Sequence, residues 1–179
     1  MISINGSGIL YCYDGEKTIV EAWGENSLRV RSTKLAEMPS EDWALSEEVS
    51  HQAEVEKIQG GALIKNGKIQ ARVSELDGKI SFYHQDGRLL LDEFVRNRKD
   101  VSASYCSALM IDAREFKPII GGDFRLTARF ESLDPNERIF GMGQYQQENL
   151  NLKGCELELA QRNSQASVPF MVSSLGYGF

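Results

Sequence analysis

The sequence has few of the residues from which metal and redox sites are built. Its three cysteines, Cys12, Cys106 and Cys155, are widely spaced and form no C-x-x-C pair, and its only histidines are His51 and His84. Zinc sites and disulfide frameworks need ligands that are clustered or evenly paired. We therefore expect no metal, no cofactor and three free thiols, which would be mostly buried, as cysteines usually are in a reducing compartment.

Long apolar runs and an excess of positive charge are also missing. No stretch approaches the roughly 18 apolar residues of a transmembrane helix, and the opening "MISINGSGILYCYDGEK" lacks the basic and apolar regions of a signal peptide. The formal net charge is −6, whereas binding to phosphate backbones depends on clustered lysine and arginine. We therefore expect a cytoplasmic protein that binds neither nucleic acid nor membranes.

Candidate catalytic residues are equally scarce. Neither histidine has a neighbour at the spacing of a metal site, and His84 lies beside a predicted hairpin turn. Asp134 and Glu137 in "LDPNERIF" could suggest a carboxylate pair, but Asp-Pro-Asn is ordinary turn chemistry. The glycines of "FGMGQ" lack the third glycine and the helix of a dinucleotide site. The residues by themselves predict no self-contained active site.

The sequence does contain a regular series of turn signals. Asn-Gly or Asp-Gly pairs at 66–67, 77–78 and 86–87 separate short runs of strand-forming residues. Such pairs favour two-residue type I′ turns between antiparallel strands. The stretch therefore predicts an antiparallel meander, and 179 residues with 41% hydrophobic content suffice for one domain with a real core.

Other segments repeat the period of two that is typical of strands with one buried face. They are residues 18–33, 123–132 ("DFRLTARFES"), 155–163 ("CELELAQRN") and 167–179, where Val168, Phe170 and Val172 alternate. Helix is predicted only as one turn after Ser40 within 39–57 and as a short segment at 144–151. The predicted fold class is all-β, an antiparallel β-sandwich with long loops and little helix.

The order of several motifs resembles one family. "ERIFGMGQ", "LNLKG", "LELAQRN" and "SVPFMVSSLGYGF" follow one another from Glu137 onward, and "NGKIQARVSELDGKISFYHQDGRLLLDE" lies upstream. This series is similar to the N-terminal domain of glycoside hydrolase family 31, the α-glucosidases and α-xylosidases. The resemblance covers roughly residues 15 to 179, and it depends on the order of the motifs because no single one is diagnostic.

The resemblance implies a galactose-mutarotase-like β-sandwich. Residues 1–179 would form a single N-terminal domain, truncated before a (β/α)₈ barrel that carries two catalytic aspartates beyond Phe179 and hydrolyses O-glycosyl bonds with retention. The chain itself would hold no catalytic residue. Its implied partners are an α-linked oligosaccharide and the downstream barrel, and subunit contacts within a homo-oligomer are common for such sandwiches. Glucoside or xyloside preference stays open.

The resemblance also implies a sugar-contacting loop. In the family, the loop between the strand that ends near Asn and the Pro-Phe strand leans over the barrel mouth. Here that loop is "QRNSQASVPF", so the implied substrate-binding residues are Arg162, Asn163, Ser164 and Gln165. Many members carry an Asp shortly after the Asn in a longer loop. Ser164 and Gln165 can still form hydrogen bonds to sugar hydroxyls but cannot make a charged contact.

Two other functions remain open at this point. A stand-alone carbohydrate-binding or protein-interaction sandwich would need an exposed aromatic platform, for which the candidates are Trp23, Trp43, Tyr145 and Tyr177. A mutarotase-like epimerase would need a positioned acid and base, which the two histidines do not suggest.

Overall fold

The structure is a computed structural model that describes residues 1–42, 45, 53–99, 101–103 and 106–179. Fourteen strands and no helix occur in these ranges, and within them no helix has the length and hydropathy needed to cross a bilayer. The chain forms two compact units, Met1–Glu131 and Ser132–Phe179. The single domain that the sequence suggests stays a prediction.

The first sheet of unit 1 is an antiparallel meander of four strands in the order β1-β2-β3-β4. Its strands are β1 (Ile2–Asn5), β2 (Gly8–Tyr13), β3 (Glu16–Ala22) and β4 (Leu28–Thr33). β2 and β3 are joined by Asp14 and Gly15, whose φ angles are 48° and 77°. Positive φ at both central residues is the type I′ turn. The sequence prediction placed this turn type further along the chain.

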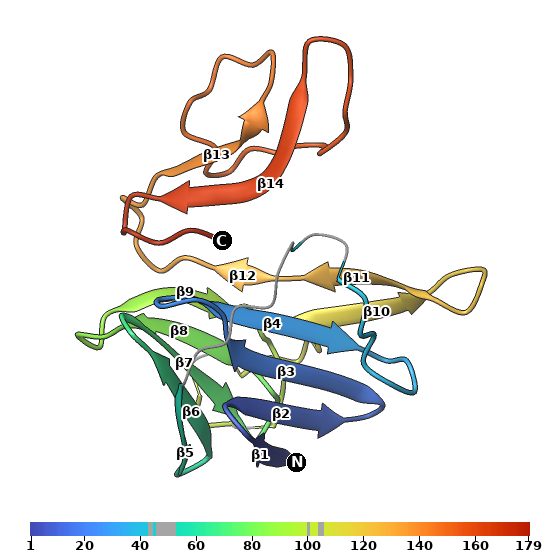
Figure 1. The fold of residues 1–179 in the computed structure, drawn as a ribbon, viewed down its shortest axis with the longest axis vertical. Coiled ribbons are helices and arrows are strands. Elements are labelled where there is room, and N and C mark those ends of the chain that lie inside the picture. Colours follow the sequence, from blue (N-terminus) through green and yellow to red (C-terminus); the bar gives the residue numbers. More distant parts are fainter. Residues whose placement is uncertain (43–44, 46–52, 100, 104–105) are drawn as a thin grey trace. The chain divides into compact units, whose positions relative to one another are not determined.

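The second sheet of unit 1 has six antiparallel strands in the order β12-β9-β8-β7-β6-β5. They are β5 (Glu54–Ile58), β6 (Gly61–Asn66), β7 (Ile69–Ser74), β8 (Ile80–His84), β9 (Leu89–Glu93) and β12 (Phe130–Glu131). The two sheets face each other in Figure 1. The predicted antiparallel sandwich is confirmed in this unit.

The core of unit 1 lies between the two sheets. Side chains from one face of β1, β2, β3, β6, β7 and β8 point into it, because successive residues of a strand face opposite sides. The buried cluster comprises Ile2, Ile9, Tyr11 and Val20 from the first sheet and Ala62, Ile64, Ala71, Val73 and Ile80 from the second. Burial of this apolar surface is the main stabilising contribution to the sandwich.

The three predicted hairpins are present, but their turns are not the predicted type. The loops are Gly67-Lys68, a four-residue loop over 75–78 and a three-residue loop over 85–87. Asn66 stays in β6 because its side-chain amide donates hydrogen bonds to the carbonyls of Gly24 and Ser27, at 2.7 and 2.8 Å. This anchor moves the turn one residue along the chain.

A further hairpin extends from unit 1 and consists of β10 (Arg114–Pro118) and β11 (Phe124–Ala128). The predicted strand over 123–132 is interrupted at Arg129, since β11 pairs with β10 and β12 pairs with β9. The apolar face of β11, which the alternation predicts to be buried, is partly exposed: Leu126 is 44% exposed. A two-stranded hairpin has no second layer of its own to cover that face.

Unit 2 is built on one antiparallel pair, β13 (Ile139–Gln144) and β14 (Ala166–Ser173). The register is irregular between Gly141 and Gly143, and the φ angles of Gly141, Met142 and Gly143 are all positive, at 98°, 66° and 107°. Figure 1 shows β14 bending strongly along its length. The "FGMGQ" glycines therefore allow β13 to curve alongside the bent strand.

Two predictions about unit 2 are wrong in part. Val168, Phe170 and Val172 do lie on a strand, but they are 46–52% exposed, because residues 132–179, all of which the structure describes, form no second sheet to cover them. Residues 155–160 form no strand, and Leu159 is exposed. Alternating sequence is not sufficient for a strand when no neighbouring strand offers hydrogen bonds.

The predicted helical segment at 144–151 is absent, and the helical turn predicted after Ser40 lies largely outside the described residues. Residues 144–151 are the end of β13 followed by bends. Within 39–57, residues 43–44 and 46–52 lie outside the described ranges; residues 39–42, 45 and 53 are irregular, and 54–57 belong to β5.

Candidate functional site

The four predicted sugar-contacting residues form one tight turn in unit 2. Arg162 and Gln165 pair across it, and the backbone N–H of Gln165 donates to the carbonyl of Arg162 at 3.0 Å. Ser164 has a φ of 64°, and a positive φ at the second central residue is typical of a type II turn. The structure therefore brings Arg162, Asn163, Ser164 and Gln165 together.

The turn presents polar groups to solvent. Arg162, Asn163 and Ser164 are exposed and Gln165 is half-buried. The guanidinium of Arg162 forms an ion pair with Glu158, four residues earlier. The amides and the hydroxyl offer both donors and acceptors, which is what neutral sugar hydroxyls require. Their contact with a sugar stays a prediction.

The two carboxylates of "LDPNERIF" have separate structural roles. Asp134 Oδ1 accepts a hydrogen bond from the N–H of Asn136 at 2.8 Å, and the Asp134 carbonyl accepts one from the N–H of Glu137 at 3.2 Å. The predicted turn is confirmed. The sequence reasoning did not identify Glu137 as a buried residue, although its side chain is 0% exposed.

Glu137 is the centre of a polar cluster in unit 2. Its Oε1 accepts hydrogen bonds from the hydroxyls of Ser173 and Tyr177, the latter at 2.8 Å. Its Oε2 has no hydrogen-bond partner and lies 3.8 Å from Nζ of Lys153. Lys153 Nζ in turn donates to the carbonyl of Asp134 at 2.6 Å. The cluster connects the start of unit 2 to the end of β14 and the Gly-Tyr-Gly turn.

The pKa of Glu137 reflects opposing effects. Desolvation is the largest and raises the pKa, but the surrounding hydroxyls and the charge of Lys153 outweigh it, so the pKa lies below its ordinary value. The pKa of Tyr177 is raised, first by burial and then by the adjacent carboxylate. These shifts favour the ionised form of Glu137 and the neutral form of Tyr177. The hydrogen bond between the two therefore has a structural role.

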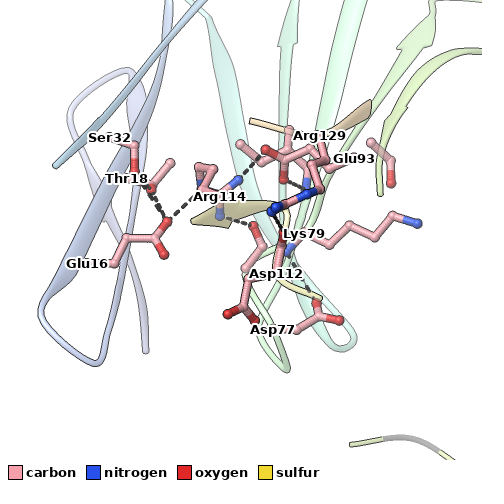
Figure 2. Close-up of polar contacts among 12 residues, drawn as sticks. Glu16, Thr18, Ser32, Asp77, Lys79, Glu93, Asp112, Arg114 and Arg129 are labelled. Carbon is pink, nitrogen blue, oxygen red and sulfur yellow. Dashed lines mark hydrogen bonds and ion pairs between the residues drawn. The ribbon is translucent and has the colours of Figure 1, made fainter. Parts of the chain in front are cut away.

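Unit 1 contains a second buried cluster, centred on Arg114 at the start of β10 (Figure 2). Arg114 Nε donates to Glu16 on β3 at 2.6 Å, Nη1 donates to Glu93 on β9, and Nη2 donates to the carbonyl of Gly78 at 2.9 Å. The side chains of Arg114 and Glu93 are 5% and 3% exposed. One guanidinium therefore links both sheets of the sandwich.

The partners of Arg114 are themselves satisfied. Glu16 Oε1 also accepts from the hydroxyl of Thr18 at 2.7 Å, and Glu93 Oε2 accepts from the N–H of Ile80 at 2.7 Å. Burial raises the pKa of Glu93 above its ordinary value although Arg114 opposes the shift. For Arg114, burial lowers the pKa, but the two carboxylates outweigh it and the net shift is upward. Arg114, Glu16 and Glu93 all have hydrogen-bonding partners within the cluster, so their role in unit 1 is structural.

The candidate aromatic platforms that the structure describes each make an intramolecular contact. The guanidinium of Arg29 lies over the ring of Trp23 at 4.7 Å from its centroid. The hydroxyls of Tyr145 and Tyr177 are engaged by Ser167 and Glu137. Trp43 lies outside the described residues. The Arg29 contact weighs against a free stacking surface at Trp23, whereas the hydroxyl contacts of the two tyrosines do not cover their ring faces.

The remaining candidates are the two histidines and the three cysteines. His84 Nδ1 lies 2.9 Å from Oδ2 of Asp86, its neighbour in the turn, and His51 is outside the described residues. The three cysteines are free, as predicted, but the prediction that they are mostly buried is wrong: Cys12 and Cys155 are half-buried and Cys106 is exposed. Cys12, for example, follows the inward-facing Tyr11 on β2 and so points to the other face. Among the described residues, no three His, Cys, Asp or Glu side chains lie close enough together to hold a metal ion.

The comparisons with known proteins agree on one family. Residues 17–179 match the model of the glycosyl hydrolase 31 N-terminal galactose mutarotase-like domain. The chain is 52% identical over 167 residues to "Uncharacterized family 31 glucosidase ORF2" of Pseudescherichia vulneris. The aligned region covers 89% of this chain and 31% of that protein.

Solved structures give the same result. A family 31 α-xylosidase from a soil metagenome, complexed with xylose, has a TM-score of 0.93 and 51% identity over 99% of this chain and 27% of its own. An α-xylosidase from Xanthomonas citri has a TM-score of 0.77 and 24% identity over 98% of this chain and 18% of its own. The chain thus spans about a third of these relatives or less, and it belongs to the N-terminal galactose-mutarotase-like domains of glycoside hydrolase family 31.

Proposed function

We propose that this chain is the non-catalytic N-terminal β-sandwich of a retaining α-glycosidase, that it supports a (β/α)₈ catalytic barrel, and that its Arg162–Gln165 turn contributes to the sugar-binding site. The observation that carries the proposal is the match of nearly the whole chain to the N-terminal part of much longer family 31 enzymes. The structure supports it further, since the buried carboxylates Glu93 and Glu137 are both engaged in structural contacts.

The proposed substrate is an α-linked xyloside. The 51% identity to an α-xylosidase crystallised with xylose supports this choice. A relative of equal similarity is named a glucosidase, so α-glucosides are the second candidate. The partner of the domain is the catalytic barrel, and the location we propose is the cytoplasm.

The division of labour can be tested with a hybrid enzyme, in which this chain replaces the corresponding N-terminal region of the soil-metagenome α-xylosidase. We expect the hybrid to hydrolyse 4-nitrophenyl α-xyloside and the 179-residue chain to hydrolyse neither that substrate nor the α-glucoside, because the catalytic aspartates would lie on the barrel. The measurement is nitrophenol release. Turnover by the purified chain, or a folded but inactive hybrid, would contradict the proposal.

The role of the turn can be tested in the same hybrid. Asn163→Ala and Gln165→Ala should each raise KM about threefold to tenfold with kcat little changed, because a neutral hydrogen bond to bound sugar contributes about 0.5–1.5 kcal/mol in ground state and transition state alike. Gln147→Ala, which removes an exposed amide elsewhere in unit 2, is the matched control. A KM that stays unchanged in both turn variants would remove the turn from the sugar site.

A stand-alone carbohydrate-binding sandwich is the alternative. Titration calorimetry of the chain with xylose, maltose and isomaltose oligomers distinguishes it, since strong binding by the isolated chain would favour the alternative.

A further inference from the structure

The base of the Arg162–Gln165 turn is closed by a single side chain. The amide of Gln161 donates from Nε2 to the carbonyl of Ser167 at 3.2 Å, and its Oε1 accepts from the backbone N–H of Ser167 at 3.3 Å. A carboxamide offers the same donor and acceptor as a peptide group. The Gln161 side chain therefore acts on Ser167 as a neighbouring strand would.

Ser167 is also held from the side of β13. It lies opposite Gly143 in the register, and a Cβ at Gly143 would overlap the carbonyl of Ala166 and come within 2.8 Å of the N–H nitrogen of Val168. Only glycine permits this approach. The hydroxyl of Tyr145 donates to the hydroxyl of Ser167 at 2.9 Å. Ser167, two residues after the turn, is thus held in place by contacts from Gln161, Gly143 and Tyr145.

We propose that Gln161 is a positioning residue that holds the Arg162–Gln165 turn in its sugar-binding conformation. The inference rests on the proposed function of that turn and assigns to Gln161 no contact with sugar. Its role is to fix the residue before the turn to the strand that follows it.

The physical reason is that the turn has few other constraints. Within it, one backbone hydrogen bond joins Gln165 to Arg162, and Ser164 adopts a left-handed conformation that is unfavourable for a residue with a side chain. A turn with one internal bond samples other conformations easily. Two more hydrogen bonds at its base reduce that freedom, and preorganisation of this kind improves binding without adding a contact.

The positioning role is tested first on the 179-residue chain by amide hydrogen exchange. Gln161→Ala should accelerate exchange at Ser167 about tenfold or more, because that N–H loses its acceptor. Gln161→Glu keeps an acceptor for the N–H but loses the donor to the Ser167 carbonyl, so exchange at Ser167 should stay within about threefold of the parent. Gln147→Ala is the control and should leave amide exchange at Ser167 unchanged.

The functional consequence is tested in the hybrid enzyme. Gln161→Ala should raise KM about threefold to tenfold with kcat and thermal unfolding unchanged. Unchanged exchange at Ser167, or an unchanged KM when Asn163→Ala does raise KM, would overturn the inference. If exchange accelerates but Asn163→Ala leaves KM unchanged, the proposed role of the turn fails instead.

Discussion

Replacing Arg114 with methionine is expected to destabilise unit 1 by about 3–5 kcal/mol, as is typical when one partner of a buried ion pair is removed. Methionine preserves most of the side-chain volume but leaves Glu93, whose side chain is 3% exposed, as an uncompensated buried carboxylate. The carbonyl of Gly78 also loses its donor. Urea unfolding monitored by tryptophan fluorescence measures the effect, because both tryptophans precede residue 132.

Arg129→Met provides a matched control. Arg129 also forms an ion pair, with Glu115, but the two side chains are 30% and 36% exposed, and such surface pairs contribute about 0–1 kcal/mol. The double variant Arg114→Met/Glu93→Leu should recover part of the lost stability, because the more deeply buried carboxylate is removed with the cation, while Glu16, whose side chain is 15% exposed, keeps the hydrogen bond from Thr18. Equal effects of Arg114→Met and Arg129→Met would show that the Arg114 cluster is not a determinant of stability.

The effect of Arg114→Met should depend on pH in a defined direction. The pKa of Glu93 is raised by burial while Arg114 opposes the shift, so loss of Arg114 raises it further. A raised folded-state pKa gives stability that is full below the ordinary glutamate pKa, about 4.3, and is lost as the pH rises through the folded-state pKa. The destabilisation relative to the parent chain should therefore be smaller at pH 5 than at pH 7.5.

The sequence predicted the strands of the sandwich better than the details of its turns. Period-two alternation and Gly-containing pairs locate the meander because they depend on neighbouring residues only. The turn at Asn66 shifted by one residue because the Asn66 amide binds carbonyls about 40 residues away. The exposure of Val168, Phe170 and Val172 could not be predicted either, since alternation shows which side chains share a face and not what covers that face.

The two buried clusters, around Arg114 and Glu137, could not be predicted from neighbouring residues either. Arg114 and Glu16 are 98 positions apart, and Glu137 and Tyr177 are 40 apart, so no spacing rule connects them. The Arg162–Gln165 segment was located only through family resemblance; the structure shows that it forms a tight turn, and its contact with a sugar stays a prediction. A polar side chain on a strand next to buried residues, such as Glu93 on β9, is the one local signal that could have been followed.

The second large effect is expected at Glu137. Glu137→Ala removes the acceptor of two hydroxyls, those of Ser173 and Tyr177, and each buried group left unsatisfied costs about 1–3 kcal/mol. We expect unit 2 to lose about 2–5 kcal/mol. Amide exchange at residues 171–174 is the readout, because tryptophan fluorescence reports only on unit 1. Glu156→Ala removes an exposed carboxylate of the same unit and should change exchange little.

The charge of Glu137 can be separated from its hydrogen bonds. Glu137→Gln keeps an oxygen that can accept from both hydroxyls but places an amide opposite Lys153, whose Nζ lies 3.8 Å from the present Oε2, so its effect should be smaller than that of alanine. Because the pKa of Glu137 is lowered, its contribution is present above the ordinary glutamate pKa and is lost as the pH falls through the folded-state pKa. The difference in exchange between the parent chain and Glu137→Gln should thus shrink in acid, and a difference that persists at acidic pH would mean that the carboxylate charge is not what stabilises unit 2.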